Sequence, residues 1–244
     1  TNTTSAANVT ITNGFTNTDT LQFTTEGAGY SVQLNVPNGT LVNASTGTIA
    51  SLAGAGGARV LAAQLDNQGT VSLPYDLTLA QASAVHLNSG TITTTGTADF
   101  TLQQTGTTPS FTNTGTITLA AGRTMSVSGG TLDLSAGLVA GSTAFLTTTL
   151  APTVRFTTAT VQPRIGFSAG TVLPDPVVIP ANDSLRIYTG TFAPPSLTNN
   201  GRLFLEGSTV LTTALTTGPG SLLRVRGTNT TSAANVTITN GFTN

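Results

Sequence analysis

A short motif recurs along the chain at intervals that suit one turn of a solenoid. Its form is apolar-x-Asn-x-Gly-Thr-apolar, with clear copies at 65–73 and 111–119 and looser copies at 88–92 and 197–205. The motif glycines Gly47, Gly69, Gly90 and Gly115 follow one another in steps of 22, 21 and 25. Periods above about 20 residues are typical of stacked repeats, whereas sandwich strands recur about every 8–12 residues. The spacing therefore favours stacked coils over a β-sandwich.

Each position of the motif has an expected structural role. Glycine is expected to supply a positive φ at a sharp corner, and asparagine tolerates the same conformation. The asparagine amide can also bond to the asparagine one coil further on. The Thr-apolar alternation that follows places one face inward and one in water. The predicted corner and ladder residues are Asn67, Gly69, Asn88, Gly90, Asn113, Gly115, Asn199 and Gly201.

Composition supports strands over helices. Threonine accounts for 53 of 244 residues, charged residues for 7%, and hydrophobic residues for 38%. β-Branched side chains pack well on a pleated surface, and this apolar content is enough for a core. An all-β chain is therefore expected.

A second, longer repeat links the two ends of the sequence. The segments 1–17 and 228–244 are identical, so the sequence returns to its own start at position 228. The simplest interpretation is a tandem array in which 1–227 is one unit of about ten coils and 228–244 begins the next identical unit. At about 4.8 Å per coil the unit would be roughly 50 Å long. Adjacent identical units, most simply in the same polypeptide, are the expected partners; the alternative is separate subunits that exchange their matching ends.

Two stretches depart from the coil pattern. Residues 51–66 are rich in Ala and Leu and could form a short helix or a tightly packed coil. Residues 152–195 contain seven of the eleven prolines. Proline cannot donate to a sheet ladder, so longer corner loops, strand ends or a lateral protrusion are expected there. This stretch is the first candidate for lateral contacts between filaments.

The asparagine-glycine corners resemble those of bacterial surface β-helices of the filamentous-haemagglutinin and autotransporter-passenger type. The resemblance covers about half the chain, mainly 36–135 and 165–210. It implies secretion to the bacterial cell surface and a right-handed fold. We therefore predict an all-β, right-handed parallel β-helix with irregular coils of about 20–25 residues.

Charge and composition argue against several classes of partner. The net charge is −1, lysine is absent, and all eight basic residues are arginines. This gives no electrostatic footprint for nucleic acid or an anionic membrane. No apolar run is long enough for membrane insertion, which needs about 18 residues. Cysteine is absent, which excludes disulfides and thiolate ligands, and neither a cofactor nor a metal site is predicted. Because the sequence starts with Thr1, we expect a segment of a longer protein.

Motifs that could indicate catalysis are weak in this sequence. The G-x-S-x-G pattern at 166–170 lacks a following helix or histidine, because Pro174 and Pro176 follow and His86 lies upstream. Alternation between Val85 and Leu87 would turn His86 outward. Two acidic pairs, Asp76 with Asp99 and Asp183 with Glu206, share the same sequence separation, close to one coil. Each pair could therefore stack like the carboxylates of a retaining glycosidase. No catalytic residue is assigned.

Structural roles for the charged and hydroxyl side chains are more consistent with the pattern. Arg186, Glu206 and Arg226 follow one another in equal steps of 20 and could form a charge ladder along one face. Thr-x-Thr runs suggest an ice-binding face, but they are unevenly repeated in the sequence.

These observations predict a structural extracellular filament or stalk of head-to-tail β-solenoid repeats, and not an enzyme. The alternative is the stalk of an adhesin that presents a binding tip elsewhere. A carbohydrate-active β-helix enzyme is the lesser alternative.

Overall fold

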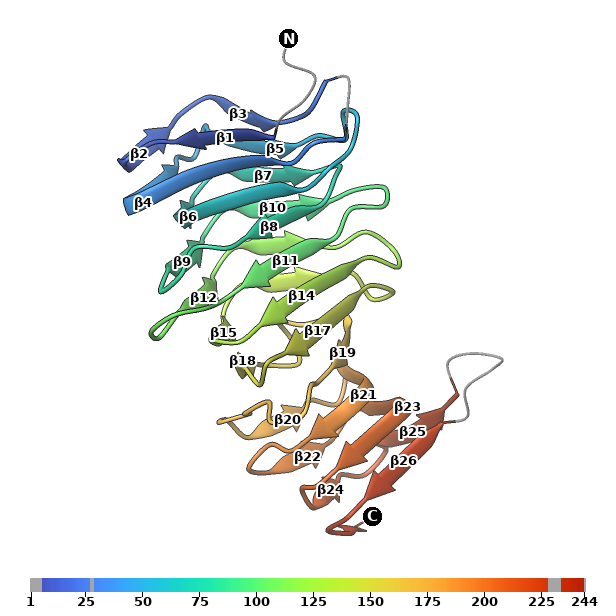
Figure 1. Ribbon diagram of the computed structural model, residues 1–244. Helices are drawn as coiled ribbons and strands as arrows, with labels where there is room; N and C mark the ends of the chain where they lie inside the picture. Colours follow the sequence, from blue (N-terminus) through green and yellow to red (C-terminus); the bar gives the residue numbers. More distant parts are fainter. Residues whose placement is uncertain (1–5, 27–28, 228–233, 244) are drawn as a thin grey trace.

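The chain folds as a parallel β-solenoid of about ten turns, and the residues that the structure describes include no helix (Figure 1). The computed structural model describes residues 6–26, 29–227 and 234–243. Strands of successive coils pair in parallel, so each coil lies on the preceding one. The predicted fold class is therefore confirmed.

Each coil of the N-terminal two thirds has three walls, joined by corners. The first wall contains β1 (Ala7–Thr10), the start of β4 (Val32–Asn43), the start of β6 (Arg59–Asn67), β8 (Leu77–Leu79), β11 (Phe100–Gln103), β14 (Thr124–Ser128), β17 (Phe145–Thr149) and β19 (Arg164–Gly166). The second wall contains β2 (Asn13–Asn17), the ends of β4 and β6, β9 (Val85–Asn88), β12 (Ser110–Asn113), β15 (Thr131–Leu134) and β18 (Thr153–Phe156).

The third wall is a separate six-stranded sheet. It contains β3 (Thr20–Phe23), β5 (Thr48–Ser51), β7 (Thr70–Leu73), β10 (Thr91–Thr94), β13 (Thr116–Thr118) and β16 (Leu138–Ala140). Its strands begin directly after the asparagine corners, so Thr48, Thr70, Thr91 and Thr116 are direct neighbours from coil to coil.

The C-terminal coils continue the same path. β20 (Val177–Ile179), β22 (Leu197–Asn199), β24 (Leu215–Thr217) and β27 (Phe242–Thr243) form a four-stranded sheet. β21 (Ser184–Phe192) and β23 (Arg202–Leu211) each turn a corner within one strand. β25 (Leu222–Arg226) stacks on the first part of β23 and β26 (Asn235–Ile238) on its second part.

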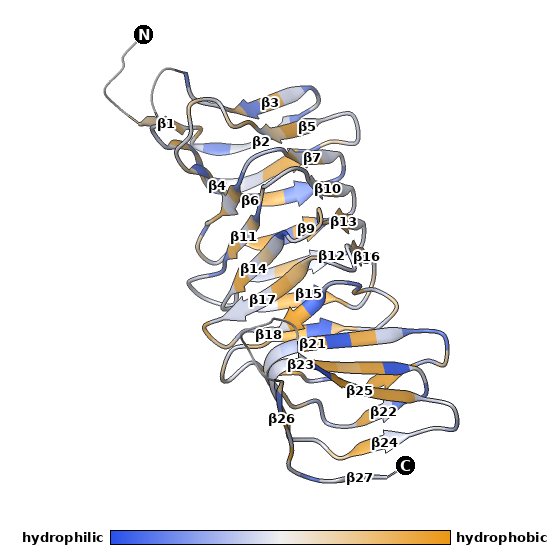
Figure 2. Cartoon of the chain, turned by 90° about the vertical axis from the view of Figure 1, so that its right-hand side faces the viewer, coloured by the Kyte–Doolittle hydropathy of each residue, from blue (hydrophilic) through white to orange (hydrophobic). Residues whose placement is uncertain are grey.

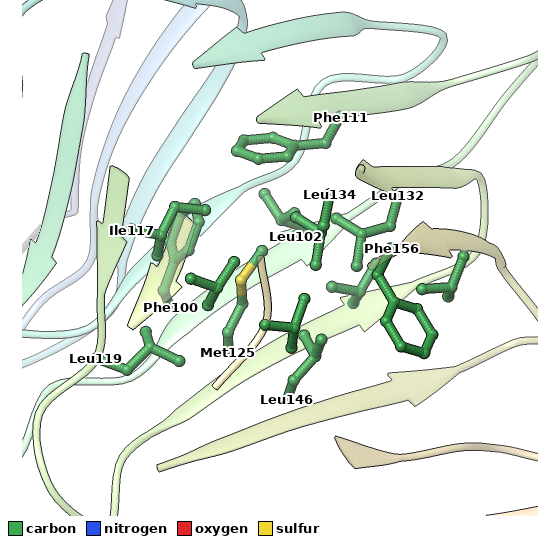
Figure 3. Packing of buried hydrophobic residues seen from close by; sticks show 14 of the residues in the cluster. Phe100, Leu102, Phe111, Ile117, Leu119, Met125, Leu132, Leu134, Leu146 and Phe156 are labelled. Atoms are coloured by element: carbon green, nitrogen blue, oxygen red, sulfur yellow. The ribbon is translucent and has the colours of Figure 1, made fainter. Parts of the chain in front are cut away.

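The interior is one continuous apolar column. In the middle of the stack, side chains such as Phe100, Leu102, Phe111, Ile117 and Met125 point inward from all three walls and are at most 1% exposed (Figure 3). The alternation that predicted strands thus fills the core, because inward positions of successive coils pair in register.

The two stretches that depart from the coil pattern, 51–66 and 152–195, differ in how they fit into the coils. Residues 51–66 form no helix: a loop at 52–58 separates β5 from β6 and wraps around Arg59. The Arg59 side chain is 1% exposed and donates to the carbonyls of Leu52, Ala53, Gly56 and Gly57. In 152–195, Pro174, Pro176 and the Pro194–Pro195 pair lie in corners, as expected from the missing N–H donor.

Candidate functional site

The predicted asparagines form a buried ladder at the corner between the second and third walls. Asn67 donates through Nδ2 to Oδ1 of Asn88 at 2.6 Å, and Asn88 donates to Asn113 at 2.6 Å. The backbone carbonyl of Asn88 also accepts from the N–H groups of Thr114 and Gly115. Because each buried amide is both donor and acceptor, one coil fixes the corner of the next.

Two further asparagines extend this ladder beyond the predicted set. Asn17 donates to Asn43 at 2.8 Å, and Asn43 donates to Asn67 at 2.7 Å. The motif did not identify Asn43, because more residues separate Asn43 from the following Thr48 than separate Asn67 from Thr70. The related Asn38 is exposed and lies at a bulge within β4. Asn199 stands apart from the ladder and donates to the Leu222 carbonyl of the next coil at 3.0 Å.

The corner positions require glycine because a side chain would clash with the neighbouring coil, and not because the backbone has a positive φ. A Cβ on Gly69 would lie 2.2 Å from the carbonyl oxygen of Ala44, and one on Gly90 would lie 2.1 Å from that of Gly69. Gly115 and Gly201 have equally close carbonyls, and none of these four has φ in the left-handed region. The expected reason for these glycines was wrong: the adjacent coil's carbonyl approaches too closely for any side chain.

The expected charge ladder forms only in part, because Ser184 pairs with Arg202, so this coil advances 18 residues and not 20. Glu206 pairs in register with Arg226, and their side chains approach to 3.8 Å. Arg186 instead lies beside Phe204, with its guanidinium 5.0 Å from the ring centroid. Arg186 is therefore out of line with Glu206, whose fully buried carboxylate meets Arg164 at 3.4 Å.

The stacked carboxylates considered for glycan cleavage serve as backbone acceptors. Asp76 Oδ1 accepts from the Asp99 N–H at 2.8 Å, and Asp99 Oδ1 accepts from the Thr124 N–H at 2.8 Å. Both line an open groove of about 410 Å³ with Arg59 and Tyr75. The other pair is not comparable, because Asp183 Oδ1 accepts from the Ser184 N–H while Glu206 is held by arginines.

The G-x-S-x-G segment forms an ordinary corner. Ser168 exchanges hydrogen bonds with Thr148 and Thr171. The pattern begins at the end of β19 and leads into Gly170, whose φ is +78°. Ser168 therefore has hydroxyl partners from the neighbouring coil and from its own corner.

His86 points inward, contrary to the expectation from its neighbours. It is 2% exposed, whereas Val85 and Leu87 are 57% and 37% exposed. Its Nδ1 accepts from the Leu65 N–H at 3.1 Å, and it pairs in register with Phe111. Alternation is preserved, but in the opposite phase, because the imidazole supplies an acceptor that β6 needs at this point.

The buried imidazole predicts an acid-sensitive contribution to stability. Burial lowers the pKa of His86 from 6.5 to about 4. The unfolded chain therefore binds a proton below about pH 6.5 that the folded chain rejects until about pH 4. The contribution of His86 to the free energy of unfolding is therefore fully present above about pH 6.5, and it falls by about 3 kcal/mol on acidification to pH 4. Urea unfolding at pH 7 and pH 4 should show His86→Gln losing about 3 kcal/mol less than the parent over this range. An equal loss in both proteins would contradict the assignment.

The identical end segments form coils of the same type. In the N-terminal copy, β1 pairs with β4 and Phe15 pairs with Leu41, both on the side of the second coil. In the C-terminal copy, β26 pairs with β23 and Phe242 pairs with Leu215, on the side of the preceding coil. The same sequence thus contacts one neighbour at each end of the molecule. The two neighbours lie on opposite sides of it.

No family model, curated protein or solved structure matches this chain. Within 6–26, 29–227 and 234–243, no group of three or more acidic or histidine side chains could hold a metal ion. The same residues include no helix that could cross a membrane.

Proposed function

We propose that this chain is a repeat unit of a structural extracellular filament in which β-solenoid units follow one another head to tail. The observation that carries the proposal is the pair of identical end segments, which form the same coil against opposite neighbours. Superposing the copies places each unit's last coils directly before the next unit's first coils.

The superposition gives a continuous register at the junction. Val236 pairs with Thr209, and its equivalent Val9 pairs with Leu34. One strand of this sequence can therefore lie between β23 of one unit and β4 of the next. With about ten coils per unit, the unit 1–227 corresponds to an axial repeat of about 48 Å.

The surface chemistry supports a structural role. Outward positions of the third wall form an uncharged column of paired threonines, namely Thr20, Thr48, Thr70, Thr91 and Thr116. Hydroxyl groups hydrate such a wall without the repulsion that like charges stacked about every 4.8 Å would create. The haemagglutinin-like corners support placing the filament at a bacterial cell surface, as part of this proposal.

The mass of the native polypeptide tests the proposal. Denaturing chromatography with mass analysis of the material from its source should give one chain several times larger than 24.5 kDa. Its proteolytic peptides should map repeatedly to the single unit 1–227. A native chain of only 24.5 kDa would contradict a covalent tandem array.

A further inference from the structure

We propose that the last complete coil of the chain has a seat that accepts the first coil of a second copy. The seat is formed by residues 208–217 and by the outer edge of β25. This inference deepens the proposed function and rests on its interpretation of residues 7–16 and 234–243 as the same coil.

The burial of equivalent side chains shows that the seat fits this sequence. Val9 and Ile11 at the N-terminal end are 53% and 37% exposed. Their equivalents Val236 and Ile238 are partly buried against the apolar column when they lie on β23. Beneath them are Thr209 and Leu211, both fully buried. The seat therefore binds this sequence through main-chain pairing and apolar burial.

The third wall of the seat lacks a covering strand among the described residues. β25 stacks on β23, and on its other side Val225 and Leu222 are 53% and 42% exposed. β3 occupies the equivalent place in the first coil, because Thr20 follows Asn17 as Arg202 follows Asn199. β3 of a second copy would then pair with β25 as Thr20 with Leu222, Leu21 with Leu223 and Phe23 with Val225. This strand would cover the exposed side chains with an apolar edge.

Charge selects head-to-tail contact over the other orientations. The C-terminal segment 184–226 carries four arginines and one acid, Glu206, whereas residues 6–58 carry Asp19 and Glu26 and no basic residue. Hydrophilic and hydrophobic segments both appear along β21 in the C-terminal part (Figure 2). Arg186 belongs to β21 and Arg202 to β23. Opposite ends attract and like ends repel, over a distance of about 10 Å at moderate salt.

The two identical end segments allow a matched pair of variants of the full chain. The substitutions Val236→Asp and Ile238→Asp should release β26 and open the seat to a second chain. Val9→Asp and Ile11→Asp change the same residues in the segment that would enter the seat. Sedimentation velocity should show at least a fivefold rise in weight-average mass for the first variant relative to the second, with comparable circular dichroism for both. Adding the N-terminal substitutions to the C-terminal ones should abolish the rise.

A disulfide tests the register. Since the chain has no cysteine, an introduced pair reports a single contact. In the seat-opened variant, Ser208→Cys with Asn8→Cys should cross-link chains end to end, because Ser208 pairs with Asn235, the equivalent of Asn8. Ser208→Cys with Thr10→Cys, two positions out of register, should cross-link at least fivefold less.

The proposed seat would be contradicted if the two cysteine pairs cross-linked equally. It would also be contradicted if polymers persisted after the N-terminal substitutions were added. A seat-opened variant that remains monomeric would contradict it as well. None of these results depends on the mass of the native chain, so the seat and the tandem filament can fail separately.

Discussion

Replacing Asn88 by leucine should lower the free energy of unfolding by about 3 kcal/mol. The substitution removes the side-chain acceptor of the Asn67 amide and the side-chain donor to the Asn113 oxygen. Both groups are buried, so neither gains water in exchange. Equilibrium denaturation in urea should show this loss with an unchanged dependence on urea concentration.

Asn38 provides the matched control for the ladder. It also precedes a Gly-Thr-apolar sequence, but its side chain is exposed and bonds to the Thr12 carbonyl. Asn38→Leu should change stability by about 0.5 kcal/mol or less. The double variant Asn88→Leu/Asn113→Leu should lose less than the sum of the single variants, because the two residues share one hydrogen bond. Equal losses at positions 38 and 88 would contradict a structural ladder.

The second large effect is expected at a corner glycine. Gly90→Ala would place a Cβ 2.1 Å from the Gly69 carbonyl oxygen, a backbone atom already engaged by Thr91. The coils must separate locally, and we expect a loss of about 3 kcal/mol. Thermal unfolding of the purified chain measures it directly.

Gly96→Ala measures the cost of the left-handed backbone conformation at a position where a side chain meets no neighbouring atom. Gly96 has φ of +58°, but no atom lies within 4 Å of the place that a Cβ would occupy. The left-handed conformation alone should cost about 1 kcal/mol. A loss at Gly90 no larger than the loss at Gly96 would contradict the close approach of the neighbouring carbonyl as the reason for the corner glycines.

The sequence predicted the architecture because its signals are local and repeated. An Asn-x-Gly-Thr corner followed by alternation appears in successive coils, and in each coil it places the same residues inward. The period of the glycines then gave the stacking. Asn67, Asn88 and Asn113 could be placed together because their coils differ little in length.

The details that sequence patterns missed depend on contacts between coils. Which phase of the alternation faces inward at His86 depends on the Leu65 N–H in the coil before it, which needs an acceptor. The partner of Arg186 depends on the length of its coil, which is 18 residues from Ser184 to its partner Arg202 and which no residue type indicates. Arg59 lies in the stretch 51–66, for which a short helix or a tightly packed coil was expected, yet its guanidinium is enclosed by the carbonyls of the loop before it.

The axial period of the native assembly is the most direct measurement of the tandem ten-coil unit. Cryo-electron microscopy or fibre diffraction should give an axial repeat of about 48 Å, divided into ten layers of about 4.8 Å. A native assembly whose repeat is far from this value, or whose layers do not run along its axis, would contradict a filament of head-to-tail solenoid units.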